Sequence, residues 1–334
     1  MTTSPIFRRI VWVSVPLLVL LAAFAFLGIS VGSSRLTPVD AFQALLGRGP
    51  EPDMLTNIIW RIRLPRVILG ALVGSTLSLG GLVFQALLRN PLAEPYILGI
   101  SGGSAVGAII GILLGFSRVP GVCLTAFSGS MAVLALVVLM GRGGIRLKKD
   151  ALLLSGVMIN AFCSSVITFL LSISQDARIH NILFWLMGDL SLPDLAQAGL
   201  LALIVLPCFL LIFRYANVMN LLLMGKEAAR TMGVNTGAAS LVLLLATSFM
   251  VSATVSYCGL LGFVGLVMPH LLRLVLGPDH RVLVPACILG GGAYMILCDI
   301  LARVLPAQGE MPTGVITAMI GAPLFIYLLK RSRI

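Results

Sequence analysis

Ten apolar segments, most of them close to 20 residues long, occupy the greater part of this 334-residue chain. A helix rises 1.5 Å per residue, so about 20 apolar residues are enough to cross the hydrocarbon core of a bilayer. The pattern therefore predicts an all-α polytopic membrane protein with about ten transmembrane helices. The segments lie at about 10–31, 64–88, 97–115, 120–140, 151–173, 195–213, 238–258, 260–276, 282–305 and 313–329.

The low proportion of charged residues excludes an ordinary soluble domain. Charged residues make up 10% of the chain and hydrophobic residues 59%, whereas a soluble domain carries about 25% charged residues. A soluble chain of this composition would expose apolar patches too large to stay in solution. The first apolar segment is too long for the core of a signal peptide, so we interpret it as a retained helix.

The basic residues set the expected orientation. With the N-terminus inside and ten crossings, most of the 23 Lys and Arg residues fall in inner connections, as the positive-inside rule requires. We therefore predict that both termini are inside. No stripe of interleaved aromatic and basic residues is present, which excludes a nucleic-acid partner. Eight cations remain outside: Arg35, Arg48, Arg61, Arg63, Arg66, Arg118, Arg178 and Arg303.

The eighth segment is short and is interrupted by small residues. It contains Gly262, Gly265 and Pro269 and follows Gly259 directly. A Gly- and Pro-interrupted apolar segment is typical of a broken helix that lines a cavity in a transporter. Close packing of helices through small residues explains the same composition equally well.

Two further stretches are neither spans nor simple turns. Residues 174–194 are moderately apolar and lie on the predicted outer side, which favours an interfacial or re-entrant helix over a plain loop. Residues 214–236 lie inside and contain good helix formers. We predict two short helices there, broken at Gly225 and closed at Gly233. An ordered hairpin with an apolar face is typical of a docking element; the alternative is a solvated loop.

Motifs for covalent chemistry are missing from the sequence. Gly225-Lys226 lacks the upstream glycine and the following Ser or Thr of a P-loop, so any ATP must be bound by another protein. The six cysteines lie in or beside apolar segments without ligand spacing, and the three histidines are scattered. We therefore expect no enzyme activity, no metal site and no cofactor in this chain.

Several motifs, in order along the chain, resemble one family. The segments are Arg63-Leu-Pro-Arg66, Gln85-Ala-Leu-Leu-Arg-Asn-Pro-Leu-Ala-Glu-Pro95, Leu98-Gly-Ile-Ser-Gly-Gly103, residues 219–233, Gly262-Phe-Val-Gly-Leu-Val-Met-Pro-His270, Gly277-Pro-Asp-His-Arg281, Asp299-Ile-Leu-Ala-Arg303 and residues 310–323. From about residue 35 to the C-terminus the chain resembles the FecCD-type permease subunits of type II ABC importers for cobalamin, haem and iron-siderophores.

The resemblance implies a single transmembrane permease domain over residues 1–334 in a bacterial plasma (inner) membrane. It implies a homodimer of permease subunits, two cytoplasmic ATPase subunits that bind ATP and Mg²⁺, and an extracytoplasmic substrate-binding protein. The cargo would be a bulky metal chelate, and we favour an iron-siderophore over cobalamin or haem because that group is the largest.

The resemblance also assigns roles to residues. The hairpin at 217–233 matches the coupling helices that seat in the ATPase, where a rigid element converts ATPase closure into movement of the attached spans. Carried over residue by residue, this coupling set is Asn217, Met219, Asn220, Leu221, Leu222, Met224, Gly225, Lys226, Glu227, Ala228, Arg230, Met232 and Gly233.

Two further sets follow from the resemblance. Arg63, Arg66 and Arg303 match positions that receive carboxylates of the binding protein, a role that suits the bidentate guanidinium. For Arg303, pairing with Asp299 four residues earlier, or snorkelling to the interface, is nearly as well supported. Asn90 and Pro91 match the neighbourhood of the inner gate.

A stand-alone secondary transporter is the competing function. Such proteins usually carry an intramembrane Asp, Glu or His relay, which the spans of this sequence do not display. A membrane-embedded enzyme would need carboxylates or histidines clustered at one depth, and the sequence shows no such cluster.

Overall fold

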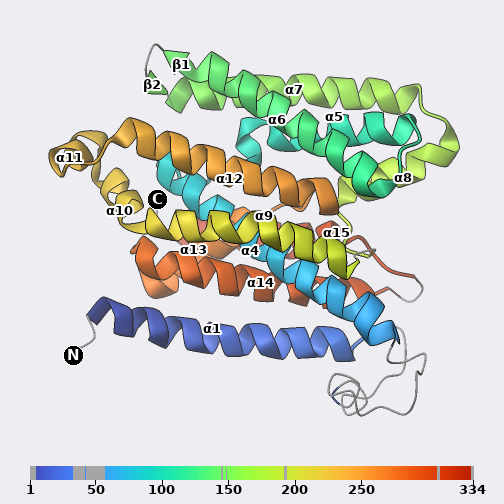
Figure 1. The fold of residues 1–334 in the computed structure, drawn as a ribbon, viewed down its shortest axis with the longest axis horizontal. Helices are drawn as coiled ribbons and strands as arrows, with labels where there is room; N and C mark the ends of the chain where they lie inside the picture. Colours follow the sequence, from blue (N-terminus) through green and yellow to red (C-terminus); the bar gives the residue numbers. More distant parts are fainter. Residues whose placement is uncertain are drawn as a thin grey trace. The chain divides into compact units, whose positions relative to one another are not determined.

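A computed structural model describes residues 5–32, 42, 57–143, 146–147, 149–191, 194–306 and 309–331. The described part is almost entirely helical, with one two-stranded antiparallel ribbon (Figure 1). The elements are α1 (Pro5–Ser30), the π-helical turn η1 (Ile59–Arg63), α4 (Leu64–Leu88), the 3₁₀ turn η2 (Pro95–Leu98), α5 (Ile100–Leu113), η3 (Arg118–Val122), α6 (Cys123–Gly141), β1 (Arg142–Gly143), β2 (Arg146–Leu147), α7 (Lys149–Ser172), α8 (Asp176–Met187), α9 (Leu195–Arg214), α10 (Ala216–Met224), α11 (Lys226–Thr231), α12 (Thr236–Cys258), α13 (Val264–Leu276), α14 (His280–Val304) and α15 (Thr313–Arg331).

The ten predicted segments are all helical. Seven helices of the described part are long and apolar enough to cross a membrane, and three shorter apolar helices, α5, α13 and α15, supply the rest. Helices suit this environment because each satisfies its backbone hydrogen bonds internally, where hydrocarbon offers no partner. The predicted fold class is confirmed. Arg35 and Arg48, which we predicted to face outside, lie beyond the described residues.

The chain divides into two compact units. Unit 1 comprises residues 1–79, 189–207 and 262–334, and unit 2 comprises residues 80–188 and 208–261. Helices α4 and α9 each contribute residues to both units.

In unit 1, α1 lies along α14 and runs in the same direction (Figure 1). A Cβ built on Gly28 would lie 3.3 Å from the Ile296 side chain, and the Arg9 guanidinium donates a hydrogen bond of 2.5 Å to the Leu276 carbonyl at the end of α13. The start of α1 and the end of α13 therefore lie at the same end of unit 1. Helices α13 and α15 pack against α14 as well.

Glycines allow α4 and α14 to touch through their backbones. A Cβ built on Gly74 would lie 2.2 Å from the carbonyl oxygen of Gly291, a distance that no side chain tolerates. Small residues let helices approach this closely in membranes, where van der Waals packing replaces the hydrophobic effect as the driving force.

Unit 2 is built around the packed helices α5, α6 and α7. Gly103 of α5 and Gly129 of α6 face each other, and a Cβ on Gly129 would lie 2.2 Å from the Gly103 carbonyl. Helix α8 forms within the stretch that we predicted to be an interfacial or re-entrant helix. Arg178 in its first turn donates a hydrogen bond to the Leu113 carbonyl at the end of α5.

The first four residues of the eighth segment, 260–263, are not helical, and α13 then runs from Val264 to Leu276 through Gly265 and Pro269. Gly259, at the end of α12, has a φ of +73°, and a Cβ there would lie 2.1 Å from the Trp185 carbonyl of α8. At Gly259 the structure therefore shows the close packing that was one of our two interpretations.

Candidate functional site

The predicted hairpin at 217–233 consists of α10 and α11. Helix α10 follows α9 after a bend at Tyr215, and it ends at Gly225, whose φ of +129° favours glycine. Gly225 then begins α11, because its carbonyl accepts the Ala229 amide at 2.9 Å. The break that we predicted from the sequence lies at this residue.

Gly233 closes the hairpin, also as predicted. Its φ is +81°, its amide donates to the Arg230 carbonyl at 2.9 Å, and the Val234 amide reaches back to the Ala229 carbonyl at 3.0 Å. This pair of bonds is the Schellman arrangement that satisfies the last carbonyls of a helix. Asn235 then caps α12 by accepting the Ala238 amide at 3.1 Å.

The hairpin buries one face and exposes an apolar tip. Met219, Leu222 and Ala229 are buried, whereas Met224 is 67% and Met232 58% exposed. Other members of the predicted coupling set are more polar or partly covered: Asn217, Glu227 and Gly233 are exposed, and Asn220, Leu221, Gly225, Ala228 and Arg230 are partly buried. The side chain of Lys226 is not among those described.

Side-chain contacts of Arg230 connect the second helix of the hairpin to α12. Arg230 lies 3.2 Å from Glu227 and donates to the Thr236 hydroxyl of α12 at 3.3 Å. The hairpin is thus anchored to α12 and presents its apolar tip outward. Exposed apolar side chains on a segment that we predict to lie outside the membrane are typical of an interaction site. The coupling role of the individual residues stays a prediction.

The predicted gate residues Asn90 and Pro91 lie in a tight turn after α4. Arg89 closes α4 with a φ of +49°, which is uncommon for a residue other than glycine. The Asn90 side chain accepts the Leu92 amide at 2.9 Å, so it fixes the turn by a local bond. Its part in a gate stays a prediction.

The chain after this turn runs back into unit 2. A Cβ on Gly80 would lie 3.0 Å from Pro95, although Gly80 is eight residues before the end of α4, which corresponds to about 12 Å along the helix. The Tyr96 hydroxyl donates to the Leu261 carbonyl at 3.1 Å and accepts the Leu261 amide at 3.2 Å.

The segment that follows the turn carries a carboxyl group, that of Glu94. The side chain is partly buried, and burial raises the pKa of its carboxyl to about 7. A carboxyl next to the predicted gate is therefore close to its titration point near neutral pH. The sequence analysis had not singled out this residue, although Glu94 stands in the motif that carries the resemblance.

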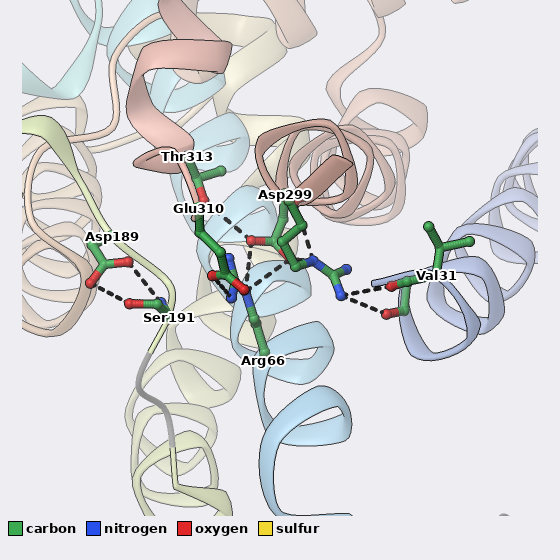
Figure 2. A network of polar contacts seen from close by, with 9 residues as sticks. Val31, Arg66, Asp189, Ser191, Asp299, Glu310 and Thr313 are labelled. Carbon is green, nitrogen blue, oxygen red and sulfur yellow. Dashed lines mark hydrogen bonds and ion pairs between the residues drawn. The ribbon is translucent and has the colours of Figure 1, made fainter. Parts of the chain in front are cut away.

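A buried polar network lies where α4, α14 and the start of α15 meet in unit 1 (Figure 2). The Arg66 guanidinium pairs with Asp299 at 2.9 Å and with Glu310 at 2.6 Å. Asp299 also accepts the Thr313 hydroxyl at 3.2 Å and pairs with Arg303 at 3.1 Å. The pairing of Asp299 with Arg303, one alternative that we derived from their spacing, is confirmed.

Two of the three predicted docking arginines hold the end of α1. Arg303 donates to the carbonyls of Gly28 and Val31 at 3.0 Å, and Arg63 donates to those of Ile29 and Ser30 at 2.7 and 2.8 Å. The last carbonyls of a helix lack partners within it and carry partial negative charge, so two guanidinium groups stabilise this end strongly.

These contacts bear on the docking prediction. Arg63 and Arg66 are each 4% exposed and Arg303 is 8% exposed. Docking through them stays a prediction, and it requires each guanidinium to exchange an internal partner for a carboxylate of another protein. The substitution Arg63→Glu would set a carboxylate against carbonyl oxygens, so it perturbs folding as well as any docking.

Known proteins show the same fold and sequence pattern. The model of the FecCD transport family matches residues 19–331. The chain is 38% identical over 326 residues to the vitamin B12 import system permease protein BtuC of Citrobacter koseri, covering 98% of this chain and 96% of that protein. It is 37% identical over 326 residues to BtuC of Salmonella typhi, with 97% and 96% covered.

Solved structures agree with these relatives. A putative metal-chelate type ABC transporter in an inward-facing conformation superposes with a TM-score of 0.84 at 31% identity, covering 95% of this chain and 98% of that one. PsaBC from Streptococcus pneumoniae, solved with a Fab, shares the fold alone, with a TM-score of 0.54 at 14% identity over 80% of this chain and 90% of that one. The family model spans nearly the whole chain and the relatives match along nearly their full length, so this protein belongs to the FecCD transport family.

Proposed function

We propose that this chain is the permease subunit of an ATP-driven importer in a bacterial inner membrane, and that its cargo is a cobalamin-type metal chelate. The observation that carries the ATP-driven part is the hairpin α10–α11, with its exposed apolar tip at Met224 and Met232. A partner ATPase that binds ATP and Mg²⁺ would cover this tip. The full assembly would hold a second permease copy, two ATPases and an external binding protein.

The relatives support cobalamin as the cargo. Two of them, identical to this chain at 38% and 37% over nearly its full length, are named vitamin B12 import permeases. Our preference for an iron-siderophore rested on the size of that group and has no specific support in these comparisons. The stand-alone secondary transporter gains no support from them either.

A substitution at the hairpin tip tests the coupling. Met224→Asp places a charge on an exposed apolar side chain that folding does not need. We expect it to reduce co-purification of the ATPase from native membranes at least tenfold, because a charge in a desolvated interface is costly. ATP-dependent uptake of cyanocobalamin into proteoliposomes should fall in parallel.

Ala238→Asp is the matched control. Ala238 is exposed in the first turn of α12, close in sequence to the hairpin, where an acidic side chain suits the helix dipole. We expect this variant to retain both the ATPase and uptake. Equal loss in both variants, or uptake by Met224→Asp at the wild-type rate, would argue against a coupling tip.

A competition experiment separates the cargoes. Excess unlabelled cobalamin should abolish uptake of labelled cyanocobalamin, and ferric siderophores at the same concentration should leave it unchanged. Uptake of a siderophore but not of cyanocobalamin would overturn the cargo while leaving the ATP-driven permease intact.

A further inference from the structure

Three arginines gather at one end of unit 1 without a carboxylate partner among the described residues. Arg8 and Arg9 lie in the first turns of α1, and Arg273 lies in the last turn of α13. Arg9 reaches the end of α13 through its bond to the Leu276 carbonyl, which joins the two helices there. The ion pairs of the described part involve other arginines. We call these three residues the cationic end.

Of the three arginines, Arg273 has a buried donor nitrogen that lacks a hydrogen-bond partner. Its Nε is buried and has no hydrogen-bond partner, and the same is true of Nε2 of His270, one turn earlier on α13. His270 is 7% exposed, so water reaches it poorly. A buried donor without an acceptor costs about 1–3 kcal/mol, and more when it is charged. An anionic acceptor beside Arg273 would therefore be strongly favoured.

Asp279, six residues after Arg273 in the sequence, already pairs with another arginine. Asp279 accepts two hydrogen bonds from Arg281, at 3.1 Å from Nε and 2.8 Å from Nη2, and it caps α14 by accepting the Arg281 amide at 3.0 Å. Its charge is therefore matched by Arg281. None of the ion pairs of the described residues involves Arg8, Arg9 or Arg273, so an added anion would balance their charge.

Exposed apolar side chains lie on the same two helices, close in sequence to these arginines. Trp12 follows Arg8 and Arg9 by one turn of α1 and is 75% exposed, and Leu274 and Val275 of α13 are 56% and 75% exposed. Tryptophan beside arginine is typical of the membrane interface, where the ring lies at the level of the headgroups. The site thus combines a cationic region with an apolar wall beside it.

We propose that the cationic end binds the headgroup of an anionic phospholipid, with the phosphate at Arg9 and Arg273 and the acyl chains along Trp12 and Val275. Basic pockets between transmembrane helices on the cytoplasmic side bind such headgroups. The charge distribution predicts that this end is cytoplasmic, where the anionic surface of a membrane lies. A free phosphate would use the arginines alone, and only a lipid also uses the apolar wall.

Native mass spectrometry of the purified, detergent-solubilised protein tests this site. Cardiolipin is titrated against phosphatidylcholine, and bound lipid is counted for the wild type and for the double variant Arg9→Gln/Arg273→Gln. We expect retention of cardiolipin over phosphatidylcholine by the wild type, and a loss of about fivefold in cardiolipin affinity for each arginine removed.

Arg61→Gln is the matched control. Arg61 is an exposed arginine of η1, near the other end of α1, and its removal changes the net charge by the same unit. It should leave cardiolipin binding unchanged. Equal losses in Arg61→Gln and in the single variant Arg9→Gln would show attraction by net charge alone and would overturn the site. Gel filtration and circular dichroism identify any variant that fails to fold.

Fluorescence of the wild-type protein gives a second readout that needs no arginine variant. The emission of Trp12 is the part of the tryptophan fluorescence that is lost in Trp12→Phe. Phosphatidylglycerol brominated on its acyl chains should quench this emission more strongly than brominated phosphatidylcholine does. Inorganic phosphate at millimolar concentration should not displace the lipid. Displacement of the lipid by phosphate would show that the site binds a free anion. If the double variant Arg9→Gln/Arg273→Gln lost the ATPase on purification but bound lipid as the wild type does, the arginines would belong to a protein interface. Either result overturns the proposal.

Discussion

The negative charge of Asp299 compensates the positive charges of two buried arginines. Arg66 and Arg303 both pair with its carboxylate, and all three side chains are at most 8% exposed. Removal of this carboxylate would leave two buried guanidinium groups short of a counter-charge, and this cost exceeds the attraction within the intact pairs. A buried charge that loses its partner is strongly destabilising, whereas the intact pair contributes little net stability.

Asp299→Asn should therefore lower the free energy of unfolding by about 3 kcal/mol or more, because it keeps the shape and removes the charge. Glu310→Gln is the comparison: Glu310 also pairs with Arg66 but is 40% exposed, so its loss should cost at most about 1 kcal/mol. Thermal unfolding in detergent measures both. Similar small losses in the two variants would show that the network is well solvated.

Glu94 makes stability depend on pH in a defined window. Burial raises the pKa of its carboxyl from 4.5 to about 7 in the folded protein. Between these two values the folded state holds more protons than the unfolded state, so stability falls as the pH rises through the window and is constant above it.

Glu94→Gln stays neutral at every pH and should avoid this loss. We expect its thermal midpoint to exceed that of the wild type by a few degrees near pH 8 and to equal it near pH 4, below the pKa of the unfolded state. Glu227→Gln, at an 88% exposed carboxylate, controls for the removal of one charge. A gain for Glu94→Gln that is the same at both pH values would assign it to packing instead.

At the scale of elements, glycines decide how closely the helices approach. Gly74→Ala must push a methyl group against the Gly291 carbonyl, because the ideal Cβ position is 2.2 Å from that oxygen. Since the backbone of α14 has to move, the free energy of unfolding should fall by about 2 kcal/mol or more.

Gly199→Ala makes the same chemical change on α9, where nothing lies within 4 Å of the added Cβ. It should be neutral or stabilising by up to about 1 kcal/mol, because alanine is the better helix former. Chemical unfolding of both variants in detergent gives the difference. If both substitutions were tolerated equally, the close contact of α4 and α14 would be wrong.

The elements that could be predicted from the sequence are those with local signals. Apolar length placed the ten helical segments, and Gly225 and Gly233 marked the two ends of the α11 helix because each glycine has a positive φ. Other features depend on residues far apart in the chain. Arg66 meets Asp299 across 233 positions, and Tyr96 meets Leu261 across 165. Local sequence patterns cannot predict contacts between residues that are so far apart in the chain.

At the scale of the whole molecule, sequence similarity contributes what local patterns lack. The charge pattern predicted an orientation and the hairpin a partner, but neither names a cargo. The apolar side chains that face outward on α7 and α9, such as Phe162 and Leu203, fit lipid and a second permease copy equally well. The proposed cargo therefore rests on the names of the relatives, and the proposed coupling role rests on the hairpin α10–α11.

The arginines at the two ends of α1 give this helix a particular mechanical character. Arg9 ties its beginning to the end of α13, and Arg63 and Arg303 tie its end to η1 and α14. Helix α1 has 26 residues and is about 39 Å long. Because arginines bind carbonyls near both of its ends, it cannot slide or tilt without breaking these hydrogen bonds. Any movement of α13 or α14 must therefore carry α1 along or break these hydrogen bonds.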